Sequence, residues 1–279
     1  MRKIGFVDYY LSEWHANNYP AWIKAANEAL GTDYEVAYAW AELETSPKDG
    51  VTTAQWCEKF GATACSTIEE LCEKSDVILI LSPSDPDKHL PYARAAFPFG
   101  KPTYIDKTFT PDLAQAKEIF AIAEKHGTPF FSTSALRYAT ELDDLKGCKR
   151  LAVTGGGGSA EEYVVHQIEM VTKTLGVGAC KARAVQMGLL TMFEVAYDDE
   201  RSATMSYCSG NPFTVLADNG TKPVWKQIRS DFFAALLRDI IRFYESGKTS
   251  FDVKETLEIM AIREASLKAL NTPGEWVEL

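Results

Sequence analysis

The chain has 279 residues, 46% of them hydrophobic and 24% charged, which is typical of globular proteins and enough for two modest domains. Its net charge of −10 repels a phosphate backbone, so the composition argues against nucleic-acid binding. The longest aliphatic run, residues 77–81, is too short to cross a membrane, and the N-terminus lacks the apolar core of a signal peptide. We therefore expect a soluble, cytoplasmic protein without membrane or nucleic-acid partners.

Strands and helices alternate through the first half of the chain. Gly31, Gly61 and Gly127 are typical of helix ends, whereas Thr110 and Pro111 are typical of a helix start. The expected strands are residues 3–8, 34–40, 76–82, 102–106 and 129–134, and the expected helices are residues 17–30, 53–61, 66–75, 87–97 and 110–127. This alternation predicts an α/β fold with a doubly wound parallel sheet.

The second half of the chain changes character. A helix is expected over residues 160–176, and several alternating strands follow it, two of them joined by a hairpin turn at residues 197–202. Two helices, residues 231–247 and 253–271, close the chain. This pattern predicts a smaller α+β domain with a mainly antiparallel sheet.

Neither the glycine-rich run nor the cysteines indicate a phosphate or metal site. The four glycines at residues 155–158 read as a flexible loop, because no Gly-Lys-Ser/Thr follows that would make a P-loop. None of the six cysteines forms a C-x-x-C pair or stands at zinc-ligand spacing from a histidine. We predict reduced, mostly buried thiols and no metal.

Several short motifs follow one another in order through the chain. They are Ser82-Pro83-Ser84 with His89 after one strand, Asp106-Lys107-Thr108 after the next, Arg137-Tyr138, and the trio Glu162, His166 and Glu169 on one helix face. In this order they resemble the Gfo/Idh/MocA family of NAD(P)-dependent oxidoreductases. That family has Thr-Pro-Asn, Glu-Lys-Pro and Asp-x-x-x-His-x-x-Asp at the corresponding places. The likeness extends over nearly the whole chain.

The resemblance implies a domain plan. It predicts a Rossmann-like nucleotide-binding domain at residues 1–134 and an α+β domain for substrate binding and oligomerisation at residues 135–279. The last helix is expected to pack back on the first domain. Relatives commonly pair through the sheet of the second domain, so a homo-oligomer is expected.

The resemblance also implies a reaction and a set of site residues. The reaction is hydride transfer between a sugar-like or polyol-like small molecule and NAD or NADP. The residues implied as cofactor contacts are Asp8, Tyr10, Ser82, Pro83, His89 and Asp106. The residues implied as substrate contacts are Arg137, Tyr138 and Glu169, although Arg137 can equally pair with Glu141.

Lys107, His166 and Glu162 are the candidate catalytic residues. A lysine beside a carbonyl oxygen stabilises negative charge on that oxygen, and a histidine exchanges protons near neutral pH. Lys107 ends an expected parallel strand, where ligands of open α/β sheets bind. The resemblance implies that the helix face carrying His166 and Glu162 looks across a cleft at Lys107. Glu162 can also be a first-turn acid that the helix dipole favours.

The turn after the first expected strand departs from the dinucleotide fingerprint. The three glycine positions of G-x-G-x-x-G are occupied by Asp8, Tyr10 and Glu13. The Tyr10 ring would lie where a diphosphate lies, and each acid would cost on the order of 1 kcal/mol beside it. The ribose-binding acid at the end of the second strand is replaced by Trp40, with Glu42 nearby. Whether NAD, NADP or no dinucleotide binds stays open.

Three functions are compatible with these residues. The first is an oxidoreductase of a polyol-like substrate that holds NAD(P) through an altered loop. The second is a non-catalytic homologue that binds a small ligand or a partner subunit. The third is a cofactor-independent lyase or isomerase that uses Lys107 and His166. The retained lysine and histidine favour an enzyme, whereas the missing glycines weigh against ordinary dinucleotide binding.

Overall fold

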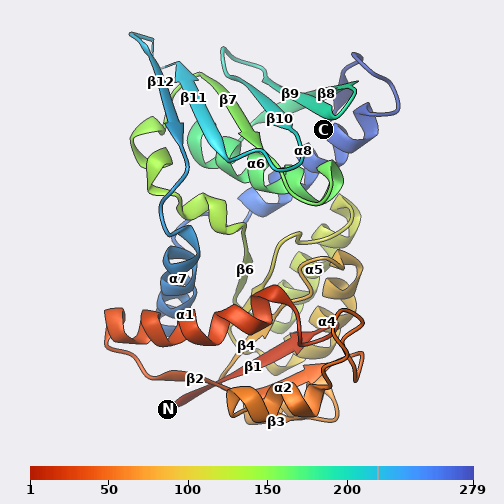
Figure 1. The fold of residues 1–279 in the computed structure, drawn as a ribbon, viewed down its shortest axis with the longest axis vertical. Coiled ribbons are helices and arrows are strands. Elements are labelled where there is room, and N and C mark those ends of the chain that lie inside the picture. The colour runs from red at the N-terminus through yellow and green to blue at the C-terminus, as the bar shows by residue number, and fades with distance from the viewer. Residues whose placement is uncertain (219) are drawn as a thin grey trace. The chain divides into compact units, whose positions relative to one another are not determined.

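A computed structural model describes residues 1–218 and 220–279 (Figure 1). The chain divides into two compact units. Unit 1 comprises Met1–Thr133 and Phe233–Val253, and unit 2 comprises Ser134–Phe232 and Lys254–Leu279. Within the described residues, no helix combines the length and the apolar character that a membrane span requires.

Unit 1 contains a six-stranded parallel sheet. Its strands are β1 (Arg2–Asp8), β2 (Tyr34–Ala41), β3 (Thr63–Ala64), β4 (Val77–Ile80), β5 (Thr103–Ile105) and β6 (Phe130–Ser132). They lie in the order β3-β2-β1-β4-β5-β6. All are parallel, and the chain adds strands to one side of β1 first and then, from β4 on, to its other side. Ligands of such sheets bind beyond the carboxyl ends of the strands at this reversal. The predicted doubly wound parallel sheet is confirmed.

Helices flank this sheet and end where the glycines predict. They are α1 (Trp14–Leu30), α2 (Thr53–Phe60), α3 (Ile68–Lys74), α4 (His89–Ala96), α5 (Leu113–His126) and α7 (Phe232–Ser246), with short 3-10 turns at Pro86–Lys88 and Phe97–Phe99. Gly31, Gly61 and Gly127 each take the left-handed conformation at the end of a helix, as expected. A residue with a side chain is strained in that conformation, which explains why glycine stands at these ends.

Two helices begin at other residues than expected. Helix α1 starts three residues early, because the Glu13 side chain caps it. Helix α5 starts at Leu113, and Asp112 is its cap, where we expected Thr110. The Thr110 hydroxyl instead donates a hydrogen bond to the backbone oxygen of Asp112 at 2.7 Å. Both Asp and Thr are good caps, so the sequence alone did not separate them.

Helix α7 completes the core of unit 1, although it follows most of unit 2 in sequence. The Tyr244 hydroxyl donates to the carbonyl oxygen of Ile78 on β4 at 2.7 Å. The Phe233 ring stacks on Trp22 of α1 with a centroid distance of 4.9 Å. The helix that packs in unit 1 is therefore α7, whereas α8, the last helix, packs in unit 2.

Unit 2 contains a seven-stranded, mainly antiparallel sheet, as predicted. Its strands, in spatial order, are β12 (Pro223–Gln227), β11 (Thr214–Asp218), β7 (Arg150–Gly155), β10 (Ser202–Tyr207), β9 (Leu190–Tyr197), β8 (Ala179–Met187) and β13 (Val277–Glu278). Only β7 and β10 pair in parallel among these strands. Helices α6 (Ala160–Leu175) and α8 (Glu255–Ala269) pack against each other, and 3-10 turns span Ala135–Tyr138 and Thr140–Leu145. The expected hairpin joins β9 to β10.

The glycine run at the end of β7 is closely packed, which corrects the expectation of a flexible loop. A Cβ atom on Gly156 would lie 2.0 Å from the backbone oxygen of Cys208. A Cβ atom on Gly157 would lie 2.1 Å from the ring of Tyr163. These glycines are present because neighbouring atoms occupy the space that a side chain needs.

Candidate functional site

Lys107 and Asp106 lie where β5 ends, in unit 1. Both are buried, with Lys107 only 7% exposed. The Asp106 carboxylate accepts the backbone N–H of Lys107 at 2.8 Å, and the Lys107 ammonium lies 3.4 Å from the carbonyl oxygen of Pro83. A buried ammonium at the carboxyl edge of a parallel sheet is well placed to meet a ligand oxygen.

His15 is a functional candidate that the sequence analysis overlooked. It lies in the first turn of α1, and its Nδ1 pairs with the Asp106 carboxylate. Its ring stacks on Tyr19 at 5.3 Å between centroids. Burial alone raises the pKa of Asp106, but the charge and hydrogen bond of His15 outweigh burial and hold that pKa below its ordinary value. The sequence offered one signal for His15, namely a histidine two residues after an acid that can cap a helix. Its partner, Asp106, lies 91 residues away, so the sequence did not indicate the pair.

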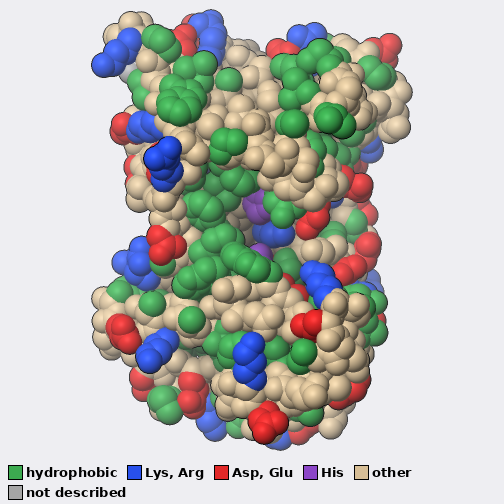
Figure 2. All heavy atoms as spheres, in the orientation of Figure 1, with side chains coloured by type: hydrophobic (Ala, Val, Ile, Leu, Met, Phe, Trp, Pro, Cys, Tyr) green, Lys and Arg blue, Asp and Glu red, His purple; other side chains and the backbone are tan. Residues whose placement is uncertain are grey.

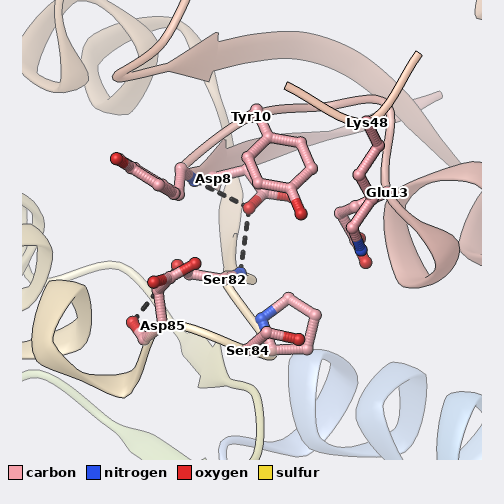
Figure 3. A pocket seen from close by; sticks show the side chains of 9 residues that line it. Asp8, Tyr10, Glu13, Lys48, Ser82, Ser84 and Asp85 are labelled. Atoms are coloured by element: carbon pink, nitrogen blue, oxygen red, sulfur yellow. Dashed lines mark hydrogen bonds between the residues drawn. The ribbon is translucent and has the colours of Figure 1, made fainter. Parts of the chain in front are cut away.

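Two more buried acids occupy the turn between β1 and α1. Glu13 Oε2 accepts the backbone N–H of His15 at 2.8 Å, and Oε1 accepts that of Ala16. Asp8 Oδ1 accepts the backbone N–H groups of Tyr9 and Ser82 at 2.7 and 3.0 Å (Figure 3). Burial, reinforced by the charge of Glu13, raises the pKa of Asp8 well above its ordinary value. Burial also raises the pKa of Glu13.

The hollow at this turn is very small. Its free volume is about 10 Å³, close to the minimum for one water molecule. The residues that line it include the predicted cofactor contacts Asp8, Tyr10, Ser82 and Pro83, together with Glu13 and Lys48 (Figure 3). The structure thus gathers four of the predicted residues at one place, but the space between them is far smaller than a nucleotide diphosphate.

His89, another predicted cofactor contact, is tied to the backbone. It is fully buried in the first turn of α4. Its two ring nitrogens lie 2.8 Å from the carbonyl oxygen of Phe109 and 2.5 Å from that of Leu81. Burial lowers the pKa of this ring and favours its neutral form. The ring therefore links two chain segments, and its contact with a cofactor stays a prediction.

The acid that follows β2 is also engaged within the chain. The Glu42 carboxylate accepts hydrogen bonds from the Lys88 ammonium at 2.5 Å and from the Tyr92 hydroxyl at 2.8 Å. The ring of Trp40 packs edge-on against Tyr92 at 5.4 Å between centroids. In dinucleotide-binding sheets, an acid at this edge of the sheet binds the ribose hydroxyls. Here that acid is bound to side chains of the same chain.

Unit 2 holds the other predicted residues, most of them in one buried network. Nδ1 of His166 lies 2.6 Å from the Ser134 hydroxyl, and the Ser134 N–H donates to Glu169 at 3.1 Å. The Arg137 guanidinium pairs with Glu169 and, at 2.6 Å, with Glu255. Burial alone lowers the pKa of Arg137, and the two carboxylates more than compensate and raise it.

These contacts place the predicted substrate residues differently from one another. Arg137 and Glu169, both expected to meet the substrate, are paired with each other, and the Glu141 carboxylate accepts a hydrogen bond from the Ser230 hydroxyl at 2.6 Å. Tyr138 is half-buried beside Arg137. Glu162 lies in the first turn of α6, where its N–H bonds to the Ser159 cap at 3.2 Å. Glu162 therefore lies at the N-terminus of α6, where its negative charge interacts favourably with the helix dipole.

Two further features concern surface charge and metal ligands. Figure 2 shows Lys and Arg side chains interspersed with Asp and Glu on the visible face, without a continuous basic patch on that face. Over residues 1–218 and 220–279, no group of three or more His, Cys, Asp or Glu side chains could hold a metal ion.

The family described as "Oxidoreductase family, NAD-binding Rossmann fold", Gfo/Idh/MocA, matches residues 25–134. Over this segment the chain is similar to the Gfo/Idh/MocA family. The matched segment contains β4, β5 and Lys107, but it begins after the turn that carries Asp8 and Glu13. The match therefore includes most strands of the sheet and the lysine, and it does not include the turn that binds the diphosphate in Rossmann folds.

Two curated proteins are similar to part of the chain. Uncharacterized oxidoreductase YhhX of Escherichia coli is 41% identical over 68 residues, 23% of this chain and 20% of its own length. Uncharacterized oxidoreductase YdgJ of the same organism is 33% identical over 93 residues, 33% of this chain and 27% of its own length. The matched segments thus span about a fifth to a quarter of the length of these relatives.

A solved structure extends the likeness to the whole fold. The myo-inositol dehydrogenase from Lactobacillus casei, crystallised with NAD(H) and myo-inositol, aligns with a TM-score of 0.81. The alignment covers 100% of this chain and 96% of that protein at 11% identity. At this identity the comparison shows the two-domain fold alone.

The residues of the first turn do not fit the cofactor that this family binds. A dinucleotide diphosphate needs free amides at the start of α1 and room for close approach of the backbone. The amides of His15 and Ala16 are bonded to Glu13, and Asp8 occupies the position of the first glycine. A buried oxygen of Asp8, Oδ2, has no hydrogen-bond partner among the described atoms, and the Asp8 side chain adds an acceptor and bulk where the fingerprint has a glycine.

Proposed function

We propose that this protein acts on a sugar-like or polyol-like small molecule, and that Lys107 and His166 bind and move the proton of a substrate hydroxyl. The observation that carries this proposal is the buried ammonium of Lys107, which follows β5 at the family's lysine position and next to the ionised Asp106. The inositol dehydrogenase of the same fold supports the choice of substrate class.

The chemistry assigned to these residues is acid–base catalysis. When a hydroxyl loses its proton, negative charge develops on its oxygen, and an ammonium group beside that oxygen stabilises it. Lys107 is assigned this role. An imidazole takes up or returns the proton near neutral pH. His166 is assigned this second role, and the Ser134 hydroxyl at 2.6 Å orients its ring. Glu162 is a proposed accessory acid on the same helix.

Two reactions are compatible with these residues. In an oxidoreductase, a bound nicotinamide would supply or accept the hydride, and the family description supports that reaction. In a lyase or isomerase acting on a sugar that has a carbonyl group, a base takes the proton from the carbon beside that carbonyl, and the electron pair moves onto the carbonyl oxygen. A proton then returns to a neighbouring carbon, or a β-hydroxyl leaves as water, so no dinucleotide is needed. The Glu13 carboxylate at the start of α1 favours the second reaction, because it occupies the amides that a dinucleotide requires. We therefore propose nucleotide-independent proton transfer and keep hydride transfer as the alternative.

A deuterium-exchange assay tests this proposal. Aldoses, whose carbonyl group acidifies the neighbouring carbon–hydrogen bond, test proton transfer, and inositols, which have no carbonyl group, test hydride transfer. Both are incubated with the protein in deuterated buffer, with and without each of NAD, NADH, NADP and NADPH, and followed by NMR and by absorbance at the nicotinamide band. We expect exchange or product formation without nucleotide, lost in Lys107→Ala and retained in Lys117→Ala, an exposed lysine of α5 in the same unit. Circular dichroism confirms that both variants are folded.

Three outcomes would contradict the proposal. Turnover that requires a nucleotide supports hydride transfer instead. Turnover that survives Lys107→Ala removes this lysine from the reaction. Binding of a polyol without any reaction supports the non-catalytic homologue. The structure describes one chain, so the expected homo-oligomer stays a prediction. The cytoplasmic location also stays a prediction.

A further inference from the structure

Helix α1 of unit 1 begins with its amides already bonded to an anion of the same chain. Glu13 is 5% exposed, and its two carboxylate oxygens accept the N–H groups of His15 and Ala16. In Rossmann folds these amides and the positive end of the helix dipole hold the diphosphate of the dinucleotide. The Glu13 carboxylate offers the same charge and the same acceptor geometry as one phosphate oxygen pair.

The strand side of the turn is closed in the same way. Asp8 ends β1, and its carboxylate accepts N–H groups from Tyr9 and from Ser82, which follows β4 on the neighbouring strand. Asp8 occupies the position of the first glycine, which serves the tight turn, and Tyr10 occupies that of the second, where a glycine lets the diphosphate approach the backbone. The remaining hollow of about 10 Å³ has room for no more than about one water molecule.

The ribose side of the same sheet edge gives a second, independent observation. The Glu42 carboxylate that would bind ribose hydroxyls is held by Lys88 and by Tyr92. The Lys88 ammonium also lies 4.6 Å from the ring centre of Tyr9, so it covers the turn from this side. A dinucleotide would have to displace internal contacts at both its diphosphate and its ribose.

We infer that this chain fills its own dinucleotide site, with the Glu13 carboxylate standing in for the cofactor diphosphate at the start of α1. The consequence is a Rossmann-type unit whose first turn needs no nucleotide to complete its hydrogen bonds and excludes one from the ordinary position. This inference concerns unit 1 alone. Nucleotide binding tests this inference, whereas turnover of a sugar-like or polyol-like substrate tests the proposed function, so the two can fail separately.

Binding of NADH, followed by its fluorescence, tests the inference in the full chain. For the wild type we expect no saturable binding at NADH concentrations up to about 1 mM, so that its dissociation constant for NADH is above about 1 mM. Glu13→Gly frees the amides and should increase the affinity at least about tenfold, and adding Asp8→Gly and Tyr10→Gly should increase it further. Glu13→Gln is the matched control, because the glutamine oxygen still caps α1 and still fills the space, so no gain is expected.

Inorganic pyrophosphate provides a second measurement if the triple glycine variant does not fold. It should bind folded Glu13→Gly more tightly than the wild type, as judged by the rise in melting temperature. Saturable NADH binding by the wild type with a dissociation constant below about 100 μM would overturn the inference. It would also be overturned by a folded Glu13→Gly variant that gains neither NADH nor pyrophosphate binding, because Glu13 would then not be the group that closes the site.

Discussion

Single charged side chains decide the chemistry of the turn in unit 1. Three acids, Asp8, Glu13 and Asp106, are buried near one another, and His15 pairs with only one of them. The paired Asp106 stays ionised, because His15 and Lys107 lower its pKa against the effect of burial. Asp8 has neither cation, so burial and the charge of Glu13 raise its pKa. Two aspartates at the carboxyl edge of the same sheet thus have opposite protonation preferences.

Replacing Asp8 with asparagine should stabilise the protein at neutral pH. The pKa of Asp8 is raised in the folded state, so the stability that its proton contributes is complete below the unfolded pKa and declines as pH rises through the folded pKa. Asparagine carries no such dependence. We expect the free energy of unfolding of Asp8→Asn to exceed that of the wild type by on the order of 1–2 kcal/mol at pH 7, and by much less near pH 4.

Urea unfolding at both pH values measures this difference. Asp87→Asn, which changes an exposed aspartate after β4 in the same unit, is the control and should alter stability little at either pH. A gain of the same size at pH 4 and pH 7 would show that Asp8 does not hold a proton in the folded state.

At the scale of elements, caps and close contacts determine where each helix and strand ends. Glu13 and Asp112 begin α1 and α5 through side-chain bonds to backbone amides. The glycine run ends β7 because the backbone of the loop after β10 lies against it. An N-cap acts within a few residues of its helix, whereas the contact of Gly156 with Cys208 joins segments about fifty residues apart in sequence.

Alanine at Gly156 should destabilise unit 2 far more than alanine at Gly158. The new methyl group at Gly156 would lie 2.0 Å from a backbone oxygen, so the chain has to shift, which should cost about 2–3 kcal/mol. At Gly158 the nearest atom, 3.3 Å away, is the end of the flexible Glu162 side chain, and we expect a change within about 0.5 kcal/mol. Urea unfolding of both variants checks this, and equal effects would contradict close packing at Gly156.

At the scale of the whole molecule, the chain builds unit 1 from two separate segments. It leaves this unit after Thr133, returns at Phe233 and leaves again after Val253. The returning segment carries α7, whose Phe243 ring packs against Phe131 of β6 at 5.0 Å between centroids. Unit 1 therefore depends on residues that lie about a hundred positions away in the sequence.

A fragment of residues 1–133 should not fold cooperatively, whereas the same fragment joined to residues 233–253 should. The reason is that α7 supplies Tyr244 and Phe243 to the core, and without it apolar surface stays exposed. A flexible linker of about 15 Gly and Ser residues joins the two pieces. Joining residues 254–275, which carry α8 of unit 2, through the same linker is the control.

Circular dichroism during urea titration distinguishes the three proteins. One sharp transition is expected for the α7 fusion only. A sharp transition in residues 1–133 alone would show that α7 is dispensable for this unit.

The sequence predicted local and periodic features well. The alternation of strands and helices, the three glycine helix ends and the hairpin after β9 all follow from residues within one or two turns of each other. It also singled out the turn at Asp8, Tyr10 and Glu13 as unsuited to a diphosphate. It placed the start of α5 at Thr110 and read the glycine run as flexible, because both depend on which neighbouring atoms compete for the same space.

The sequence by itself therefore determined the order of the elements, the similarity of residues 25–134 to the Gfo/Idh/MocA family and the absence of the glycine fingerprint. Only the tertiary structure decided which contacts the residues at the former glycine positions make. Glu13 turns back to cap α1, His15 pairs with Asp106 across the sheet edge, and α7 joins the first unit. The physical reason is that side-chain periodicity is a property of neighbouring residues, whereas a hydrogen bond or an ion pair requires a partner that only folding brings near.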